Sequence, residues 1–126
     1  MYHDVLIRIK NAQAVGKERI KVPYSRFDFD ILKVLSQYKF IGSISEKGRG
    51  IKKMIEISLI GDKANPAVNG LKFFSRPSKK VYRGSQEIKA VKQGFGLGVI
   101  STSKGIMNSM KAKKEKLGGE YLFEIW

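Results

Sequence analysis

The stretch from Ser25 to Tyr38 constrains the fold most, because its apolar residues recur with the period of an α-helix. These residues would form one continuous apolar face: Phe27, Ile31, Val34, Leu35 and Tyr38. Ser25 precedes the repeat and Asp28 follows three residues later, which predicts a capping box at the first turn. A helix with one apolar face must pack on another element, so a hydrophobic core is expected beside it.

The rest of the first half completes an α-β-α-β-β order. A first helix is predicted over residues 2–14, with an apolar stripe of Tyr2, Val5, Leu6, Ile9 and Ala12 and a separate polar stripe of Asp4, Arg8 and Asn11. Gly16 ends this helix, and residues 19–22 form a short strand that stops at Pro23. Residues 40–60 contain two β-rich runs around "KGRG", a pattern typical of a hairpin.

Residues 61–70, "GDKANPAVNG", are the best candidate for a boundary, because turn-forming residues cluster there and periodicity lapses. We therefore expect an N-terminal α/β domain over residues 1–62 and a mainly β domain over residues 63–126. The link is too short for the two domains to move freely, so we expect them to pack tightly together. The predicted fold class is therefore α+β, with two small, tightly packed domains.

The second half is predicted to contain four β runs and one short helix. The β runs cover residues 71–74, 76–83, 94–102 and 121–126. The helix lies between the last two runs, with a partial apolar face of Ile106, Met107, Met110 and Leu117, and is capped by Gly118 and Gly119. The glycines at positions 94, 96 and 98 favour close backbone approach within a strand.

The charge of the chain indicates a polyanionic partner. The 126 residues carry a net charge of +14, of which +6 falls in residues 1–60 and +8 in residues 61–126. Such a charge disfavours compaction unless a partner neutralises it, so nucleic acid is the first candidate and an anionic membrane the second. The chain has no cysteine and one histidine, which argues against disulfides and a zinc site. No apolar run is long enough to predict a membrane span or signal peptide.

The segment "STSKG", Ser101 to Gly105, allows three interpretations. Ser101 and Lys104 match the S-x-x-K pattern of serine hydrolases, but the companion motifs are absent and the chain is too short for that architecture. No complete phosphate-binding glycine motif is present either. We therefore predict no enzyme, no cofactor, no metal and no small-molecule substrate.

Nucleic-acid binding is the interpretation that remains. Ser101, Thr102, Ser103 and Lys104 offer hydroxyls and a cation on a loop expected to enter a helix, whose N-terminus would favour phosphate. Lys111, Lys113, Lys114 and Lys116 follow as candidate phosphate contacts. Tyr82 stands among Arg76, Lys79, Lys80 and Arg83, where an aromatic ring could stack on an unpaired base. No DNA-binding motif is readable, and hydroxyl-rich loops suit the shallow minor groove of RNA.

Several elements resemble one known family. "DVLIRIKNAQ", "SRPSKKVY", "STSKGIM" and "KLGGEYLFEIW" occur in the order and spacing of bacterial small-subunit ribosomal protein eight. The resemblance implies two α/β domains that bind an irregular helix in the central domain of 16S ribosomal RNA early in subunit assembly. It places the protein in the ribosome, in the cytoplasm or in an organelle. Its implied neighbours are other small-subunit proteins, notably protein five, and its own operon messenger RNA is an implied second target.

The resemblance also implies the site residues. Ser101, Thr102, Ser103, Lys104 and Gly105 would form the recognition loop, flanked by Tyr82 and Lys80. Arg83, from the same basic segment, is a further candidate RNA contact. Arg8 and Asn11 would face additional RNA, and Lys111 and Lys113 would take the role of family arginines, although lysine lacks the bidentate fork. Ile7, Ser78 and residues 108–113 depart from the family pattern. The alternative function is an RNA-binding regulator outside the ribosome, such as a translational repressor.

Overall fold

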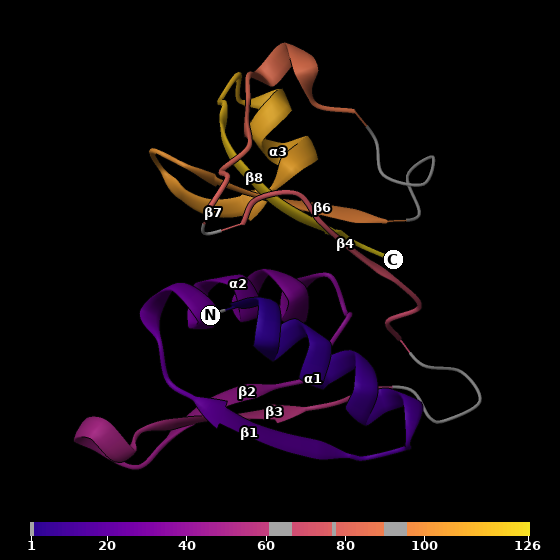
Figure 1. Cartoon of the computed structure of the whole chain (residues 1–126), viewed down its shortest axis with the longest axis vertical. Coiled ribbons are helices and arrows are strands. Elements are labelled where there is room, and N and C mark those ends of the chain that lie inside the picture. Colours follow the sequence, from indigo (N-terminus) through magenta and orange to yellow (C-terminus); the bar gives the residue numbers. More distant parts are fainter. Residues whose placement is uncertain (1, 61–66, 77, 90–95) are drawn as a thin grey trace. The chain divides into compact units, whose positions relative to one another are not determined.

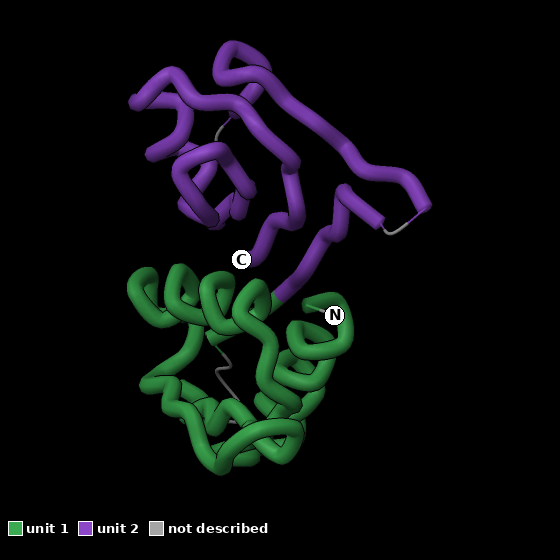
Figure 2. The backbone as a smooth tube through the Cα atoms, turned by 90° about the vertical axis from the view of Figure 1, so that its left-hand side faces the viewer, with its two compact units in different colours: residues 1–69 green, residues 70–126 purple. Residues whose placement is uncertain are grey.

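The computed structural model describes residues 2–60, 67–76, 78–89 and 96–126. These residues form two compact units, Met1–Asn69 and Gly70–Trp126 (Figure 2). Helices, strands and two antiparallel sheets together make a mixed α/β fold, as predicted from the sequence. The predicted boundary after residue 62 lies outside the described residues.

Unit 1 has the predicted α-β-α-β-β order. Its elements are α1 (Tyr2–Ala14), β1 (Arg19–Pro23), α2 (Arg26–Gln37), β2 (Ile44–Lys47), the short 3-10 turn η1 (Gly50–Lys52) and β3 (Met54–Ser58). The strands form an antiparallel sheet in the order β1-β3-β2, and Figure 1 shows both helices on the same face of it. The alternating residues Ile55 and Ile57 point into the core beneath the helices, where both are fully buried.

The helical pattern of α1 is confirmed and that of α2 is confirmed in part, because Phe27 and Tyr38 of its predicted apolar face are each 40% exposed at the two ends of the helix. The predicted stripe of α1 is buried along its whole length, and Ile31, Val34 and Leu35 of α2 are buried beside it. The predicted capping box of α2 is wrong. Ser25 occupies the N-cap position with extended backbone, but its side chain makes no capping hydrogen bond. Asp28 is instead buried.

A buried amide ties the end of unit 1 to its first helix. The Gln13 side chain donates from Nε2 to the carbonyl of Phe40 at 3.3 Å, and its Oε1 accepts a hydrogen bond from the Val68 amide at 2.9 Å. Gln13 is almost fully buried, so both contacts satisfy groups that would otherwise be costly inside the core. Val68 therefore packs as part of unit 1.

Unit 2 is an antiparallel sheet with one covering helix. Its elements are β4 (Leu71–Phe73), β5 (Tyr82–Arg83), the 3-10 turn η2 (Ser85–Glu87), β6 (Leu97–Thr102), β7 (Gly105–Asn108), α3 (Ser109–Lys114) and β8 (Gly119–Ile125). The order is β4-β8-β6-β7, and β5 also pairs with β8. A core cluster of Ile88, Ile100, Met107, Ala112 and Tyr121 lies between the sheet and α3.

The region around the lysine-rich segment differs from the prediction. Residues Gly105–Asn108 form strand β7, so Ile106 and Met107 lie in a strand, and α3 has only six residues. The helix does not end at Gly118 and Gly119. Lys116 takes the left-handed conformation, with φ of +59°, and the Leu117 amide bonds back to the Ala112 carbonyl at 2.8 Å. Gly119 belongs to β8.

The run over residues 76–83 is less regular than predicted. Only Tyr82 and Arg83 form a strand, and before them Arg76 and Lys79 exchange two backbone hydrogen bonds of 3.0 Å across a tight turn. The start of the predicted run at residue 94 lies outside the described residues, while β6 confirms its remainder from Leu97 to Thr102. Gly98 there permits close approach, since a side chain would overlap the hydroxyls of Ser109 and Tyr121.

Candidate nucleic-acid interface

The segment Ser101 to Gly105 is a β-hairpin turn rather than a loop that enters a helix. Thr102 pairs with Gly105 at the end of β6 and β7, which leaves Ser103 and Lys104 as a two-residue turn. Neither turn residue has a positive φ. The positive value falls on Gly105, at +114°. The predicted helix N-terminus is therefore not available for phosphate here, because β7 separates the turn from α3.

The Thr102 hydroxyl fixes the shape of this turn. Its Oγ1 donates to the Gly105 carbonyl at 2.8 Å and accepts from the Lys104 amide at 3.2 Å. Among the residues that the structure describes, the hydroxyls of Ser101 and Ser103 have no hydrogen-bond partner, and Ser103 and Lys104 are exposed. Thr102 thus shapes the turn, while the two serines keep donors and acceptors for another molecule.

The sheet brings Tyr82 into line with this hairpin. Strand β8 lies between β5 and β6, and its residue Glu120 pairs with Tyr82 on one side and with Ser101 on the other. Paired residues in an antiparallel sheet share a face, so the three side chains form one row. The Tyr82 side chain is 67% exposed. Two segments about twenty residues apart in sequence therefore contribute to one surface.

A buried serine holds Tyr82 in this position. The Ser75 hydroxyl donates to the carbonyl of Tyr121 at 2.9 Å and accepts from the Val81 amide at 2.9 Å, while the Tyr121 amide donates to the Val81 carbonyl at 2.8 Å. These bonds attach residue 81 to β8 directly before Tyr82. Ser75 was not among the predicted site residues, although it stands in the quoted "SRPSKKVY" element.

Arg83 lies on the opposite face from Tyr82. Its guanidinium carbon is 5.2 Å from the centre of the Phe74 ring and 5.1 Å from that of Tyr121. These cation–π contacts hold the side chain over the core aromatic residues. The structure therefore does not bring Arg83 into the Tyr82 row, whereas Lys80 is exposed just before Tyr82.

The two predicted lysines of α3 differ in their surroundings. Lys111 is exposed with its ammonium free of any ion pair among the described residues. The ammonium of Lys113 donates to the carbonyl of Ile88 at 2.8 Å, which links α3 to the residue after η2. Lys113 thus has a packing role that its sequence position did not reveal, because the contact spans 25 residues.

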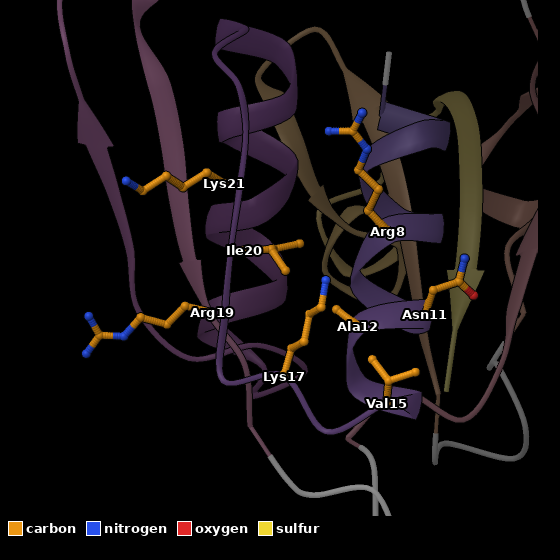
Figure 3. A pocket seen from close by; sticks show the side chains of 8 residues that line it. All are labelled: Arg8, Asn11, Ala12, Val15, Lys17, Arg19, Ile20 and Lys21. Carbon is orange, nitrogen blue, oxygen red and sulfur yellow. The ribbon is translucent and has the colours of Figure 1, made fainter.

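Arg8 and Asn11 line a basic groove in unit 1. This groove has a volume of about 530 Å³ and runs between α1 and β1, with Arg8, Asn11, Ala12, Val15, Lys17, Arg19, Ile20 and Lys21 along it. Figure 3 shows Ile20 on the side of β1 that faces α1, while Arg19 and Lys21 point away from α1. Arg19 also pairs with Glu56 at 3.4 Å. No acidic residue lines the groove in the described part of the chain.

Sequence reasoning missed two features of these surfaces. Glu120 stands in the Tyr82 row, and its only sequence signal is its place in the "LGGE" element. The groove cation Lys17 was treated as scattered charge, because its place in one groove with Arg8 depends on the packing of β1 beside α1. Across the described residues, no group of acidic residues, histidines or cysteines could hold a metal ion. In the same part of the chain, no helix is long and apolar enough to span a membrane.

These observations define a class of protein: a basic α+β chain in two units that presents hydroxyls, cations and an exposed aromatic ring on an antiparallel sheet. The family model described as ribosomal protein S8 matches residues 1–126. A small ribosomal subunit protein uS8 from Synechocystis sp. is 40% identical over 125 residues, which cover 98% of this chain and 94% of that protein.

Two further relatives with similar identity and coverage are also uS8 proteins. The uS8 protein of Persephonella marina is 38% identical over 129 residues, covering 98% of this chain and 95% of its own length. The uS8c protein of Guillardia theta is 39% identical over 125 residues, with the same two coverages. The chain belongs to the ribosomal protein S8 family and is a structural, non-enzymatic component of the small ribosomal subunit. Ribosomal RNA and other ribosomal proteins are the partners that this membership implies.

Proposed function

We propose that the chain binds an irregular helix in the central domain of 16S ribosomal RNA through the β6–β7 hairpin, and thereby supports assembly of the small subunit. The observation that carries the proposal is the row of Tyr82, Glu120 and Ser101 across three strands. It brings an exposed aromatic ring and the unpaired hydroxyl of Ser101 to one face of the sheet. An irregular RNA helix offers the matching features, an open minor groove and a displaced base.

Each group of the row and of the adjacent turn has a distinct task in this proposal. The hydroxyls of Ser101 and Ser103 can donate to base edges and accept from ribose 2′-hydroxyls in the minor groove. Lys104 contacts phosphate beside the turn. The Tyr82 ring stacks on the displaced base, an interaction typically worth ~1–3 kcal/mol. Glu120 accepts a hydrogen bond from an exocyclic amino group, which would favour particular bases.

Further RNA contacts lie away from the hairpin. Lys80 and Lys111 are exposed cations of unit 2, and Arg8 and Asn11 open onto the basic groove of unit 1. These groups bind phosphates and raise affinity without reading sequence. Arg83 and Lys113 act chiefly in packing, through the ring and carbonyl contacts described above, and bind RNA at most through their outer edges.

The same surface would accept a messenger RNA with a similar fold. Translational repression of its own operon is therefore part of the proposal, as is contact with protein five in the subunit. Both extend the family resemblance, and an RNA-binding regulator outside the ribosome, such as a translational repressor, is the main alternative to a purely ribosomal role. We also propose that the two units are separate domains.

The test compares Ser103→Ala with Lys104→Ala on two RNAs. The RNAs are the central-domain helix and a regular duplex of equal length. Ser103→Ala should reduce the preference for the irregular helix, because it removes a minor-groove contact. Lys104→Ala should weaken both complexes and lower the slope of log K against log salt by about one. Lys33→Ala, an exposed cation of α2, is the control. Equal losses on both RNAs from both variants would exclude this recognition loop.

A further inference from the structure

The β2–β3 hairpin ends in a cationic turn with an exposed aliphatic side chain at its tip. The hairpin tip, residues 47–53, has the sequence "KGRGIKK". Ile51 lies at its centre and is 102% exposed, the highest value among the exposed large hydrophobic residues. Figure 1 shows the turn η1 beyond the ends of β2 and β3 in unit 1. A partner that covered this side chain would gain the free energy of removing its apolar surface from water.

The turn is fixed by its own backbone. Lys52 donates to the carbonyl of Arg49 at 3.2 Å, and Lys53 donates to that of Gly50 at 3.2 Å, which forms the 3-10 turn. Gly48 has a φ of +84°, and a side chain there would lie 2.8 Å from the Lys52 carbonyl oxygen. The tip therefore holds one defined shape.

The base of the turn is anchored to Tyr24, the residue that follows β1. The Tyr24 amide donates to the Lys53 carbonyl at 3.1 Å, and the Lys53 ammonium lies 4.0 Å from the centre of the Tyr24 ring. The same ammonium pairs with the Glu46 carboxylate at 2.9 Å, and this hydrogen bond raises the pKa of Lys53. Glu46 is the acidic residue of the hairpin nearest to the tip. Its negative charge is neutralised by the ion pair with Lys53.

The remaining charges of the tip are all positive. Lys47, Arg49 and Lys52 are exposed, and none has an ion-pair partner among the described residues. Three unpaired cations around an apolar side chain fit a polyanion that also offers an apolar surface. The wide, shallow minor groove of an RNA helix does so, because phosphates flank a floor of ribose C–H groups. Isoleucine has no ring for stacking, so an unpaired base is a poorer match.

We propose that the hairpin tip is a second RNA-binding element, which docks Ile51 into the minor groove of an RNA helix while Arg49 and Lys52 contact the phosphates on either side. The inference rests on the proposed ribosomal RNA binding of the chain. It adds a contact that does not involve the β6–β7 hairpin, made by a different unit of the protein.

The absence of cysteine allows a direct test. Ile51→Cys introduces a unique thiol at a fully exposed position, which can be labelled with an iron chelate that generates hydroxyl radicals. When the labelled chain is bound to small-subunit ribosomal RNA, strand cleavage should occur on both strands of a helix, offset across one minor groove. Lys33→Cys on α2, labelled in the same way, is the matched control and should cleave different nucleotides or none.

A charge test complements the cleavage experiment. Arg49→Ala/Lys52→Ala should lower affinity about 10-fold or more at moderate salt and reduce the salt slope by about two. Arg26→Ala/Lys33→Ala removes the same two side chains from α2 and should have a smaller effect. Ile51→Ser should weaken binding while leaving the salt slope unchanged.

The outcomes separate this inference from the proposed function. If the unmodified chain binds the RNA and Ser103→Ala impairs recognition, but the Ile51→Cys probe produces no cleavage, the tip inference is wrong and the proposed function stands. Cleavage confined to single-stranded nucleotides would also overturn the groove docking. If the unmodified chain does not bind ribosomal RNA at low salt, both fail.

Discussion

The carbonyl oxygen of Ser101 lies so close to Gly119 that any side chain at position 119 would overlap it. The α-carbon of Thr102 would be only 3.1 Å from the same side chain. Gly119 begins β8, the strand that separates the hairpin from Tyr82. The close approach of two backbones at this point therefore determines how the candidate interface is assembled.

Gly119→Ala should destabilise unit 2 and weaken RNA binding together. The added methyl group meets backbone rather than a flexible side chain, so β6 and β8 must separate. We expect the free energy of unfolding to fall by about 1–3 kcal/mol, as for overpacked sites. Urea denaturation measures this change. Gly84→Ala is the matched control, because the nearest atom to its new methyl group, the carboxylate oxygen of Glu87, is 3.5 Å away. Equal losses in the two variants would contradict the close approach.

Thr102→Val should loosen the recognition turn while the fold is kept. Valine preserves the branched shape but removes the hydrogen bonds to the Lys104 amide and the Gly105 carbonyl. We expect a stability loss of about 0.5–1.5 kcal/mol and faster hydrogen exchange at the Lys104 amide. RNA affinity should fall more than stability alone would predict, since Ser103 and Lys104 lose their fixed positions.

Thr102→Ser is the control for this prediction. Serine retains the hydroxyl, so the exchange rate of the Lys104 amide should stay near that of the unmodified chain. If serine and valine accelerated exchange equally, the hydroxyl would not be the group that shapes the turn.

Local periodicity was sufficient to predict unit 1. The stripes of α1 and α2 are each set by residues three or four positions apart, and the alternation of Ile55 and Ile57 identifies β3 from its own sequence. The capping box failed because Asp28 is buried against other parts of unit 1. A rule that considers only residues 25–28 contains no information on that burial.

Unit 2 depends more on contacts between distant segments. Sequence reasoning placed Ile106 and Met107 on a helix, since both are spaced acceptably for one, but pairing with β6 makes them a strand. The register between β6 and β8 shifts between Val99 and Ile100, so Phe123 and Tyr121 face opposite sides of the sheet. Simple alternation over residues 121–126 could not reveal this shift.

In the candidate site, too, some features follow from local sequence and others from contacts between distant segments. The residues of the turn itself were predicted from their types and from a family resemblance. The distinction between Tyr82, which faces outward, and Arg83, which packs on Phe74 and Tyr121, requires knowledge of which face α3 covers. Glu120 and Ser75 escaped notice because their roles come from strands that pair across the sheet.

Asp28→Asn should stabilise the chain increasingly as the pH rises. Burial raises the pKa of Asp28 above its ordinary value of 3.8, and the nearby Asp4 carboxylate adds to this, while His3 acts against it. Because this pKa is higher in the folded state, the protonated carboxyl contributes its full stabilisation below the pKa of the unfolded chain. That contribution is lost as the pH rises through the pKa of the folded state. Asparagine does not titrate, so the advantage of the variant should grow as the pH rises above the ordinary carboxyl pKa of 3.8.

Urea denaturation across this pH range measures the difference between the two proteins. Because burial is the main cause, the trend should persist at high salt, where surface charge pairs are screened. Parallel stability curves for the variant and the unmodified chain would show that Asp28 is ionised equally easily in the folded and unfolded states.

Lys116→Gly should stabilise the chain, although it removes a side chain from a basic segment. Lys116 has a φ of +59° directly after the C-cap of α3, a conformation that costs about 1–2 kcal/mol for a residue with a β-carbon. Glycine adopts it freely but loses more entropy on folding, so we expect a net gain of about 0.5–1 kcal/mol. Thermal unfolding measures the change. Lys114→Gly, which removes the same charge inside α3, should instead lower stability by about 0.5–1 kcal/mol. A loss of stability in both variants would mean that the left-handed turn does not end α3 in solution.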